Sequence, residues 1–336
     1  MQIRRSKITQ SLEFDIFWNQ NLSPINISSM STVVAQVLTK PLFELSWNFV
    51  PLFPQHPVRK PPKQLLKWIG NKQRFAEGIC SYFPVLDPDS KYIEPFIGSG
   101  ALLGAMAPPN GLAGDMLQPL IELWRILQTD PQKLFDSYKL RWLQYQKEPD
   151  RTYRSVLASY NEEPNGLDLL FLSRSCYGGV IRFTKQGKMS TPRGPHNPIS
   201  PESFKERMLL WRQRLVHTKF VHAPYQETMG LARAGDVIYC DPPYQDSQSI
   251  LYGAQAFRLN ELWSTIQQCK ARGALVALSI DGRKKSGAKT IDLGIPRGLF
   301  TREIYVKGGS SMLRRFQKKD DVMIGEDVQD RLLLTW

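Results

Sequence analysis

Short apolar runs alternate with segments of helical periodicity along most of the chain after residue 90. Seven runs rich in branched and aromatic residues predict strands; they lie at 92–96, 111–115, 220–223, 237–240, 274–280, 302–306 and 331–336. Between them, apolar residues recur every three or four positions and predict helices over 117–127, 134–145 and 204–215. Strands separated by helices favour a parallel or mixed α/β sheet.

Two stretches depart from this pattern. Residues 51–62, PLFPQHPVRKPP, contain five prolines, which favours an extended chain and a boundary. We therefore interpret residues 1–62 as an N-terminal extension of uncertain order. Between about 150 and 200 the periodicity is lost, and residues 173–201 are rich in glycine, proline, serine and basic residues. A long irregular segment is typical either of a functional loop or of disorder.

The charge balance narrows the class of partner. The 336 residues include 44 lysines and arginines against 31 acids, which gives a net charge of +13. Such an excess favours a polyanionic partner, most often nucleic acid, although a merely basic enzyme is the alternative. Aromatic and basic residues alternate in 173–201, which suits contact with bases and phosphates, and a solvated loop is the alternative there.

Several classes of protein are disfavoured. The four cysteines, at 80, 176, 240 and 269, form no C-x-x-C pair, and the four histidines have no metal-ligand spacing. We expect no metal site and a reducing, cytoplasmic environment. The apolar runs are too short to span a membrane, and the start, MQIRRSKITQ, is not followed by the apolar core of a secretory signal.

The segment VIYCDPPYQ, residues 237–245, ends a predicted strand with an acid, two prolines and a tyrosine. Ligands of α/β sheets bind at the carboxyl ends of strands. The Asp241 carboxylate and the Pro242 carbonyl are acceptors, Pro243 has no N–H, and Tyr244 adds a flat ring. This array fits a planar substrate that donates an amino group and stacks on the ring. The alternative is a proline-rich turn whose aspartate caps the next helix.

A glycine loop precedes a second acid. EPFIGSG, residues 94–100, joins a predicted strand to a helix, so Gly98 and Gly100 would let the backbone approach a ligand. Asp115 ends the next strand, where an acid typically binds ribose hydroxyls. Together these features favour an adenosine-containing cofactor, and a plain strand–turn–helix is the alternative. The absence of G-x-x-x-x-G-K-[ST] argues against a P-loop NTPase.

Three motifs occur in a fixed order: KWIGNK (67–72), EPFIGSG (94–100) and YCDPPY (239–244). In this order they resemble the Dam-type family of DNA adenine-N6 methyltransferases, the alpha group or D12 class, from about residue 63 to the end. The resemblance implies an α/β fold, with a Rossmann-like class I S-adenosylmethionine-dependent methyltransferase sheet. It implies a catalytic domain of residues 63–118 and 216–336. An inserted, mainly helical target-recognition domain would occupy 119–215.

The resemblance also assigns site residues. It implies that a flipped adenine is held by the catalytic residues Asp241, Pro242, Pro243 and Tyr244. It implies that S-adenosylmethionine is bound by Trp68, Gly70, Lys72, Phe96, Gly98, Gly100, Asp115, Tyr225 and Asp241. Within these, Asp115 would bind the ribose, and Tyr225 would pack near the adenine of the cofactor.

A DNA-contacting hairpin is implied by 171–194, which is similar to the family pattern N-R-x-x-x-N-G-x-x-R. Its expected DNA-binding residues are Arg174, Tyr177, Arg182, Lys185, Lys188 and Arg193. The basic clusters at 283–285 and 314–319 are further candidates, with solvated surface as the alternative. Asn71, Ser173 and Gly178 depart from the residues common in the family.

The expected activity is transfer of a methyl group to N6 of adenine in double-stranded DNA, in restriction–modification with a cognate endonuclease or as a solitary methylase. We expect a cytoplasmic monomer or weak dimer without membrane contact. Four alternatives remain open at this point: RNA adenine-N6 methylation, DNA cytosine-N4 methylation, methylation of a protein glutamine, and a catalytically inactive DNA-binding relative.

Overall fold

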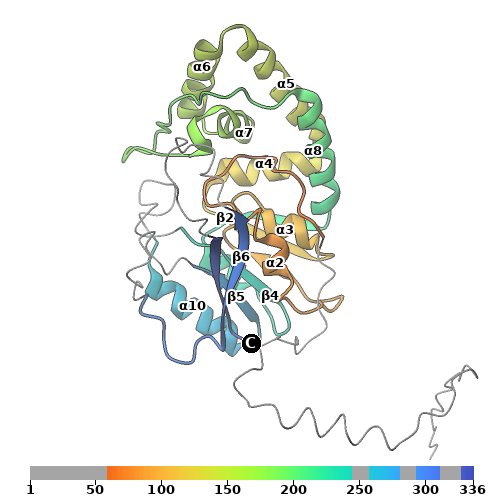
Figure 1. The fold of residues 1–336 in the computed structure, drawn as a ribbon, viewed down its shortest axis with the longest axis vertical. Helices are drawn as coiled ribbons and strands as arrows, with labels where there is room; N and C mark the ends of the chain where they lie inside the picture. The colour runs from red at the N-terminus through yellow and green to blue at the C-terminus, as the bar shows by residue number, and fades with distance from the viewer. Residues whose placement is uncertain (1–58, 244–256, 281–292, 311–326) are drawn as a thin grey trace, which may run out of the picture. The chain divides into compact units, whose positions relative to one another are not determined.

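The structure, a computed structural model, describes residues 59–243, 257–280, 293–310 and 327–336 (Figure 1). The chain divides into two units, residues 1–50 and 51–336, and every described residue belongs to the second. Most of the expected N-terminal extension therefore lies outside the described residues. Within the described ranges, no helix combines the length and apolar character that crossing a membrane requires.

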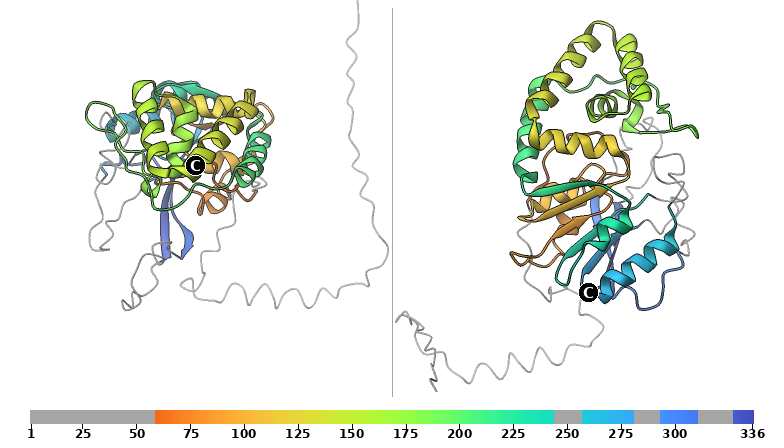
Figure 2. Two further views of the ribbon diagram at one scale, coloured as in Figure 1. Left: turned by 90° about the horizontal axis from the view of Figure 1, so that it is seen from above. Right: turned by 180° about the vertical axis from the view of Figure 1, so that it is seen from behind.

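Seven strands form one mixed sheet in the order β3-β2-β1-β4-β5-β7-β6. They are β1 (Tyr92–Glu94), β2 (Gly111–Asp115), β3 (Thr218–His222), β4 (Val237–Cys240), β5 (Leu275–Ser279), β6 (Arg302–Ser310) and β7 (Asp327–Leu334). The first five run parallel, whereas β7 is antiparallel to both of its neighbours. This arrangement confirms the predicted mixed α/β sheet, and Figure 2 shows it from behind.

Alternating side chains divide the core between the two faces of the sheet. In β4, Val237 and Tyr239 pack in one cluster, whereas Ile238 and Cys240 pack in the other. The first cluster includes residues of α2 (Ala76–Cys80) and α3 (Ala101–Met106), and the second includes residues of α9 (Tyr225–Gly230) and α10 (Leu259–Ala271). Helices on both faces explain why β1 and β4 are buried along their whole length.

Five helices lie between β2 and β3 in the chain. They are α4 (Gln118–Thr129), α5 (Pro131–Lys147), α6 (Pro149–Glu162), α7 (Gly166–Ser175) and α8 (Pro201–Leu215). Prolines at the starts of α4, α5, α6 and α8 favour helix initiation, and Asp130 caps α5 by accepting a hydrogen bond from the Lys133 backbone. In Figure 1, α4 lies nearest the sheet and α5 to α7 lie beyond it.

The expectation that regular structure is lost from residue 150 is wrong for α6 and α7. In α6, Tyr153, Val156 and Tyr160 recur at helical spacing and are buried. Helix α7 is buried at nearly every position, so it has no polar face to reveal a helical period. Beyond α7, the chain does become irregular, with a 3₁₀ turn, η2 (Tyr177–Gly179), and a short hairpin bridged at Phe183 and Met189.

Aromatic packing joins these helices to the sheet. The ring of Trp124 on α4 stacks on Phe220 of β3, with centroids 6.1 Å apart, and tilts against Trp211 of α8 at 5.4 Å. Both tryptophans are fully buried. The Trp211 indole N–H also donates to the Lys63 carbonyl at 2.9 Å. Helices α4 to α8 therefore share a core with the sheet.

Gly166→Ala tests this packing. A Cβ at position 166 would lie 2.5 Å from the Leu123 backbone nitrogen on α4, where only backbone movement could relieve the clash. We expect the substitution to lower the free energy of unfolding by about 1–3 kcal/mol, measured by urea denaturation.

The matched control is Gly230→Ala, because a Cβ there would have no neighbour within 4 Å. We expect its stability to stay within about 0.5 kcal/mol of the wild type. Equal stabilities of the two variants would contradict the close approach of α7 to α4.

Candidate active site

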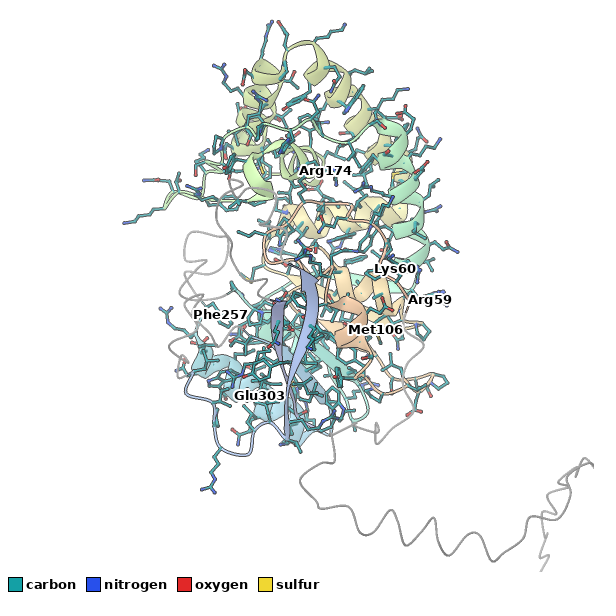
Figure 3. All side chains as sticks on the ribbon, in the orientation of Figure 1. Arg59, Lys60, Met106, Arg174, Phe257 and Glu303 are labelled. Atoms are coloured by element: carbon teal, nitrogen blue, oxygen red, sulfur yellow. The ribbon has the colours of Figure 1, made fainter. Side chains whose placement is uncertain are left out.

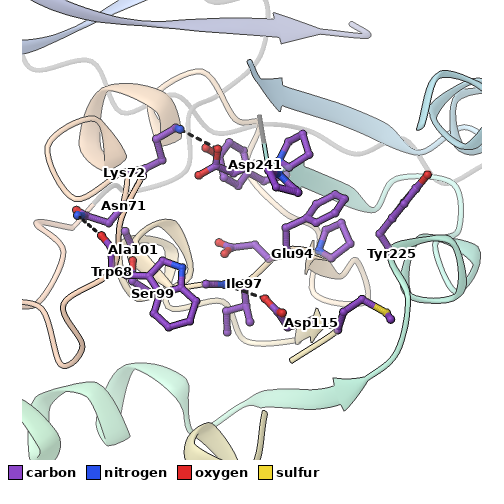
Figure 4. Close-up of a pocket in the computed structure, with 18 of the residues that line it drawn as sticks. Trp68, Asn71, Lys72, Glu94, Ile97, Ser99, Ala101, Asp115, Tyr225 and Asp241 are labelled. Carbon is purple, nitrogen blue, oxygen red and sulfur yellow. Dashed lines mark hydrogen bonds and ion pairs between the residues drawn. The ribbon is translucent and has the colours of Figure 1, made fainter. Parts of the chain in front are cut away.

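A pocket of about 280 Å³ opens at the carboxyl ends of β1, β2 and β4 (Figure 4). Its lining comes from segments that are far apart in the chain: 68–72, 94–99, 101–102, 115–116, 224–226 and 241–243, with Ile181, Tyr239 and Phe257. The carboxyl edge of parallel strands is where α/β sheets bind ligands, so the strand order itself explains the position of the pocket.

Asp241 follows β4 and is paired with a buried lysine. The Lys72 Nζ atom lies 2.7 Å from Asp241 Oδ1 and 3.4 Å from Asp330 Oδ1. The side chains of Lys72 and Asp330 are each 7% exposed, whereas that of Asp241 is 20% exposed at the pocket wall. A single ammonium group thus contacts two carboxylates; Lys72 and Asp241 line the pocket, whereas Asp330 does not.

Burial and charge act in opposite directions on Asp241. Loss of hydration raises its pKa to about 6, the Lys72 ammonium opposes this rise, and the Asp330 carboxylate adds to it. Asp241 is therefore ionised at neutral pH and is available as an acceptor. The prolines that follow, Pro242 and Pro243, also line the pocket.

Glu94 is a second carboxyl group in the pocket wall. It ends β1, is 3% exposed, and accepts a 2.8 Å hydrogen bond from Tyr92. Burial raises the pKa of Glu94 to about 8, although the Tyr92 hydrogen bond opposes the shift. At neutral pH the protonated form therefore predominates.

The glycine loop and Asp115 are linked directly. Asp115 Oδ2 accepts a hydrogen bond from the Gly98 N–H at 3.3 Å, and its Oδ1 accepts from the Leu117 N–H at 3.0 Å. Gly98 has φ +45°, and a Cβ there would lie 3.1 Å from the Trp68 indole nitrogen. Gly100, at φ +66°, lets the chain turn into α3.

Aromatic rings form the other wall of the pocket. Phe96 and Tyr225 stack with centroids 5.1 Å apart, and the Phe257 ring lies 6.1 Å from Phe96 at 82°. The buried Tyr225 hydroxyl has no hydrogen-bond partner within the described parts of the chain. The pocket therefore offers flat apolar surface together with one polar group that a ligand could satisfy.

The loop containing KWIGNK adopts a fixed turn. Gly70 has φ +72°, and the Asn71 amide donates to the Trp68 carbonyl at 2.8 Å. Asn71 Oδ1 accepts from Gln64 and from the Gln73 backbone. This departure from the family pattern therefore has a local role, because Asn71 crosslinks the turn that carries Trp68 and Lys72.

The expected DNA-contacting residues occupy different environments. Tyr177 is 60% exposed, and Arg182, Lys185 and Lys188 are exposed on the hairpin. Ile181, in the same hairpin, lines the pocket. These exposed groups therefore lie on a segment that reaches the pocket.

Arg174 differs from expectation, whereas the expected DNA contact of Arg193 stays a prediction. Arg174 is 3% exposed within the helices (Figure 3) and donates to the Leu65 carbonyl at 2.9 Å. Burial lowers the pKa of Arg174 to about 10. Its placement corrects the expectation of a surface contact, since it joins α7 to the segment before Trp68. Arg193 forms a 2.7 Å ion pair with Asp150.

Some expected residues lie outside the described part of the chain: Tyr244 and the basic clusters at 283–285 and 314–319. The structure also brings in residues that the sequence patterns did not identify. Glu94 belonged to a quoted motif, but no signal marked it as buried and protonated. Asp330 could have been noticed as an acid beside the apolar run RLLL. Phe257 carried no local signal. Within the described residues, no three potential ligands form a metal cluster.

Glu94→Gln tests the protonation of the buried carboxyl. Because the folded-state pKa is about 8 against the usual 4.5, the native state binds more protons than the unfolded state between these values. Wild-type stability relative to Glu94→Gln should therefore fall as pH rises from 5 to 8, by up to about 1.4 kcal/mol per unit, and level off above 8. Urea denaturation across this range measures it, and a constant difference would contradict the assignment.

The family match and the individual relatives of this chain agree on one family. The family described as D12 class N6 adenine-specific DNA methyltransferase matches residues 68–287. The DNA adenine methylase of Vibrio cholerae serotype O1 is 28% identical over 190 residues, which cover 55% of this chain and 66% of that protein. The Retron Ec67 DNA adenine methylase of Escherichia coli is 29% identical over 192 residues, covering 55% and 65%.

A more distant relative is the type II methyltransferase M.MjaIII of Methanocaldococcus jannaschii, which is 26% identical over 202 residues, covering 54% of this chain and 69% of that protein. The matched region spans just under two thirds of the Vibrio and retron methylases.

Proposed function

Because the chain belongs to the D12 class of N6 adenine-specific DNA methyltransferases, we propose that it methylates N6 of adenine in duplex DNA. The observation that carries this proposal is the position of Asp241. Its ionised carboxylate directly follows β4, lines the pocket and is followed by two prolines that also line it. Such an array of acceptors suits an exocyclic amino group.

Asp241 and the Pro242 carbonyl would each accept a hydrogen bond from the N6 amino group. Two acceptors draw the nitrogen lone pair towards tetrahedral character and aim it away from the ring. The nitrogen would then bond to the methyl carbon as the bond between that carbon and the donor sulfur breaks, with its electron pair left on the sulfur, and would afterwards lose a proton. Asp241, with its pKa of about 6, is a suitable acceptor for that proton. Positioning and electrostatics supply most of the rate in this account.

The pocket residues fit S-adenosylmethionine, which supplies an electrophilic methyl group on a positively charged sulfur when bound. Asp115 would accept from the ribose hydroxyls, and Phe96 and Tyr225 would pack beside the adenine ring. The unpartnered Tyr225 hydroxyl supports this fit, because a buried polar group favours a ligand that satisfies it. Further expected contacts come from Trp68, Gly70, Lys72, Gly98 and Gly100.

Helices α4 to α8 and the hairpin between α7 and α8 would form the target-recognition part of the enzyme. The exposed Tyr177, Arg182, Lys185 and Lys188 support this role, since phosphate contacts from cations dominate the affinity for DNA. The target adenine would leave the base stack to reach Asp241, at a cost of a few kcal/mol. Tyr244 would stack on the extruded base.

The biological setting is either restriction–modification, beside a cognate endonuclease, or a solitary methylase. One relative carries the name type II methyltransferase, which supports the first setting, and the other two carry the name DNA adenine methylase, which suits the second. We propose a cytoplasmic enzyme that acts as a monomer or weak dimer. Cytosine N4 and RNA adenine present similar amino groups and are outcomes of the test below.

Asp241→Asn tests the proposed chemistry. Replacing the carboxylate with an amide removes one acceptor and introduces a donor facing the amino group. We expect methyl transfer to unmethylated plasmid DNA to fall by about 10²–10³-fold or more. Nucleosides from the wild-type reaction should contain N6-methyldeoxyadenosine, as measured by mass spectrometry. N4-methylcytosine, methylated RNA alone, or full activity of Asp241→Asn would contradict the proposal.

Asp236→Asn is the matched control. Asp236 directly precedes β4, at the end of the strand opposite to Asp241, and is 3% exposed. Its carboxylate accepts hydrogen bonds from the backbone N–H groups of Lys91 and Arg233. Its substitution should lower stability but leave the rate at 25 °C within about twofold. A parallel loss of rate would show that any buried carboxylate in this sheet has the same effect.

Lys185→Ala tests the hairpin as a DNA contact. Because Lys185 is exposed beside the pocket-lining segment, its removal should reduce the slope of log affinity against log salt by about one, measured by fluorescence anisotropy with duplex DNA. Lys219→Ala, which removes an exposed charge from the edge strand β3, should leave the slope unchanged. Identical slopes for both variants would show that the DNA interface does not include Lys185 of the hairpin.

A further inference from the structure

A chain of buried polar groups connects two pocket-lining residues, Tyr239 and Lys72, through Ser279 and Asp330, which lie outside the lining. The Tyr239 hydroxyl donates to Ser279 Oγ at 2.8 Å, and the Ser279 hydroxyl donates to Asp330 Oδ2 at 2.6 Å. The other carboxylate oxygen, Asp330 Oδ1, lies 3.4 Å from Lys72 Nζ, which contacts Asp241 at 2.7 Å. These groups come from β4, β5, β7 and the loop before α2.

The carboxylate of Asp330 is the centre of this chain. Ser279 is fully buried and Asp330 is 7% exposed, and neither belongs to the pocket lining. Each oxygen of the Asp330 carboxylate is engaged, one by a hydroxyl and one by the ammonium of Lys72. Its position in the core is therefore fixed, and Lys72 is the residue that connects it to Asp241.

We propose that Asp330 is a positioning residue for Asp241 that acts through Lys72. This inference rests on the proposed adenine methylation and adds a residue to it that touches neither base nor cofactor. Asp330 draws the ammonium away from a position centred on Asp241. The ammonium then holds Asp241 Oδ1, which leaves the other carboxylate oxygen to face the amino group of the substrate.

The alternative is that Asp330 only stabilises the sheet. An acid in the core of an antiparallel strand costs free energy unless it is paired, and an apolar residue of similar volume often stabilises such a site equally well. A stabilising role would predict a lower melting temperature and no change in how the chemical step depends on pH. A positioning role predicts a change in the melting temperature and also a change in how the rate of the chemical step depends on pH.

The groups that face Asp241 set the sign of this change. Lys72 favours the ionised carboxylate, Asp330 disfavours it, and the neighbouring Glu94 is mostly neutral below pH 8. Burial raises the pKa of the adjacent Cys240 thiol, so it stays neutral as well. Removing Asp330 should therefore favour ionised Asp241, whereas removing Lys72 should oppose it.

The experiment is the pH dependence of single-turnover methyl transfer between pH 5 and 8. Asp330→Asn should lower the maximum rate by about tenfold to a hundredfold, because Asp241 loses its orientation. It should also move the acidic limb by about one unit to lower pH. Lys72→Gln should move the same limb to higher pH. These opposite shifts distinguish positioning from a general loss of stability, which would leave the acidic limb unchanged in both variants.

The outcomes separate this inference from the proposed function. An inactive wild-type protein would overturn the methylation proposal. An active wild type with an unshifted limb in Asp330→Asn, matching Asp236→Asn, would overturn the positioning role alone. If Asp330→Asn does not fold by circular dichroism, Ser279→Ala replaces it, because it frees Asp330 Oδ2 without changing charge. That variant should keep the limb and lose rate by about tenfold, and an unchanged rate would overturn the inference.

Discussion

One buried ammonium group shared by two carboxylates organises the carboxyl edge of this sheet. Lys72 comes from the loop before α2, Asp241 from the end of β4 and Asp330 from β7, so the contacts join segments more than eighty residues apart in sequence. Separation of either carboxylate from Lys72 would leave a buried charge without its partner, which is costly. These two ion pairs therefore couple the correct assembly of the sheet to the orientation of Asp241 in the pocket.

Two acids at the same edge of the sheet, Glu94 and Asp241, differ in protonation state and therefore in what they can do chemically. Glu94 is 3% exposed, accepts from Tyr92 and is mostly protonated at neutral pH, whereas Asp241 has Lys72 beside it and is ionised. In this account, only the ionised acid accepts from the amino group of the substrate. The aromatic wall of Phe96 and Tyr225 stands on the other side, where a methyl donor would pack.

Much of this was accessible from sequence, because strand ends and glycine turns have strong local signals. The strands followed from alternation, and Gly98 and Asp115 followed from their positions at strand ends. The pocket residues Trp68, Lys72 and Tyr225 were implied only by the family resemblance. Helix α7 was not predicted, because a helix buried all round has no amphipathic period. Arg174 was assigned to DNA by its resemblance to a family pattern, yet its environment depends on packing that a local pattern does not contain. Asp330 was missed for the same reason, since its partners, Lys72 in the loop before α2 and Ser279 on β5, are distant in sequence.

The most direct test of the account is a crystal structure of the protein with S-adenosylhomocysteine and a duplex that carries its methylation sequence. We expect the target adenine outside the base stack, with N6 within about 3 Å of both the Asp241 carboxylate and the Pro242 carbonyl. The cofactor adenine should lie beside Phe96 and Tyr225. An adenine that remains stacked in the duplex, or an Asp241 carboxylate directed away from N6, would contradict the account.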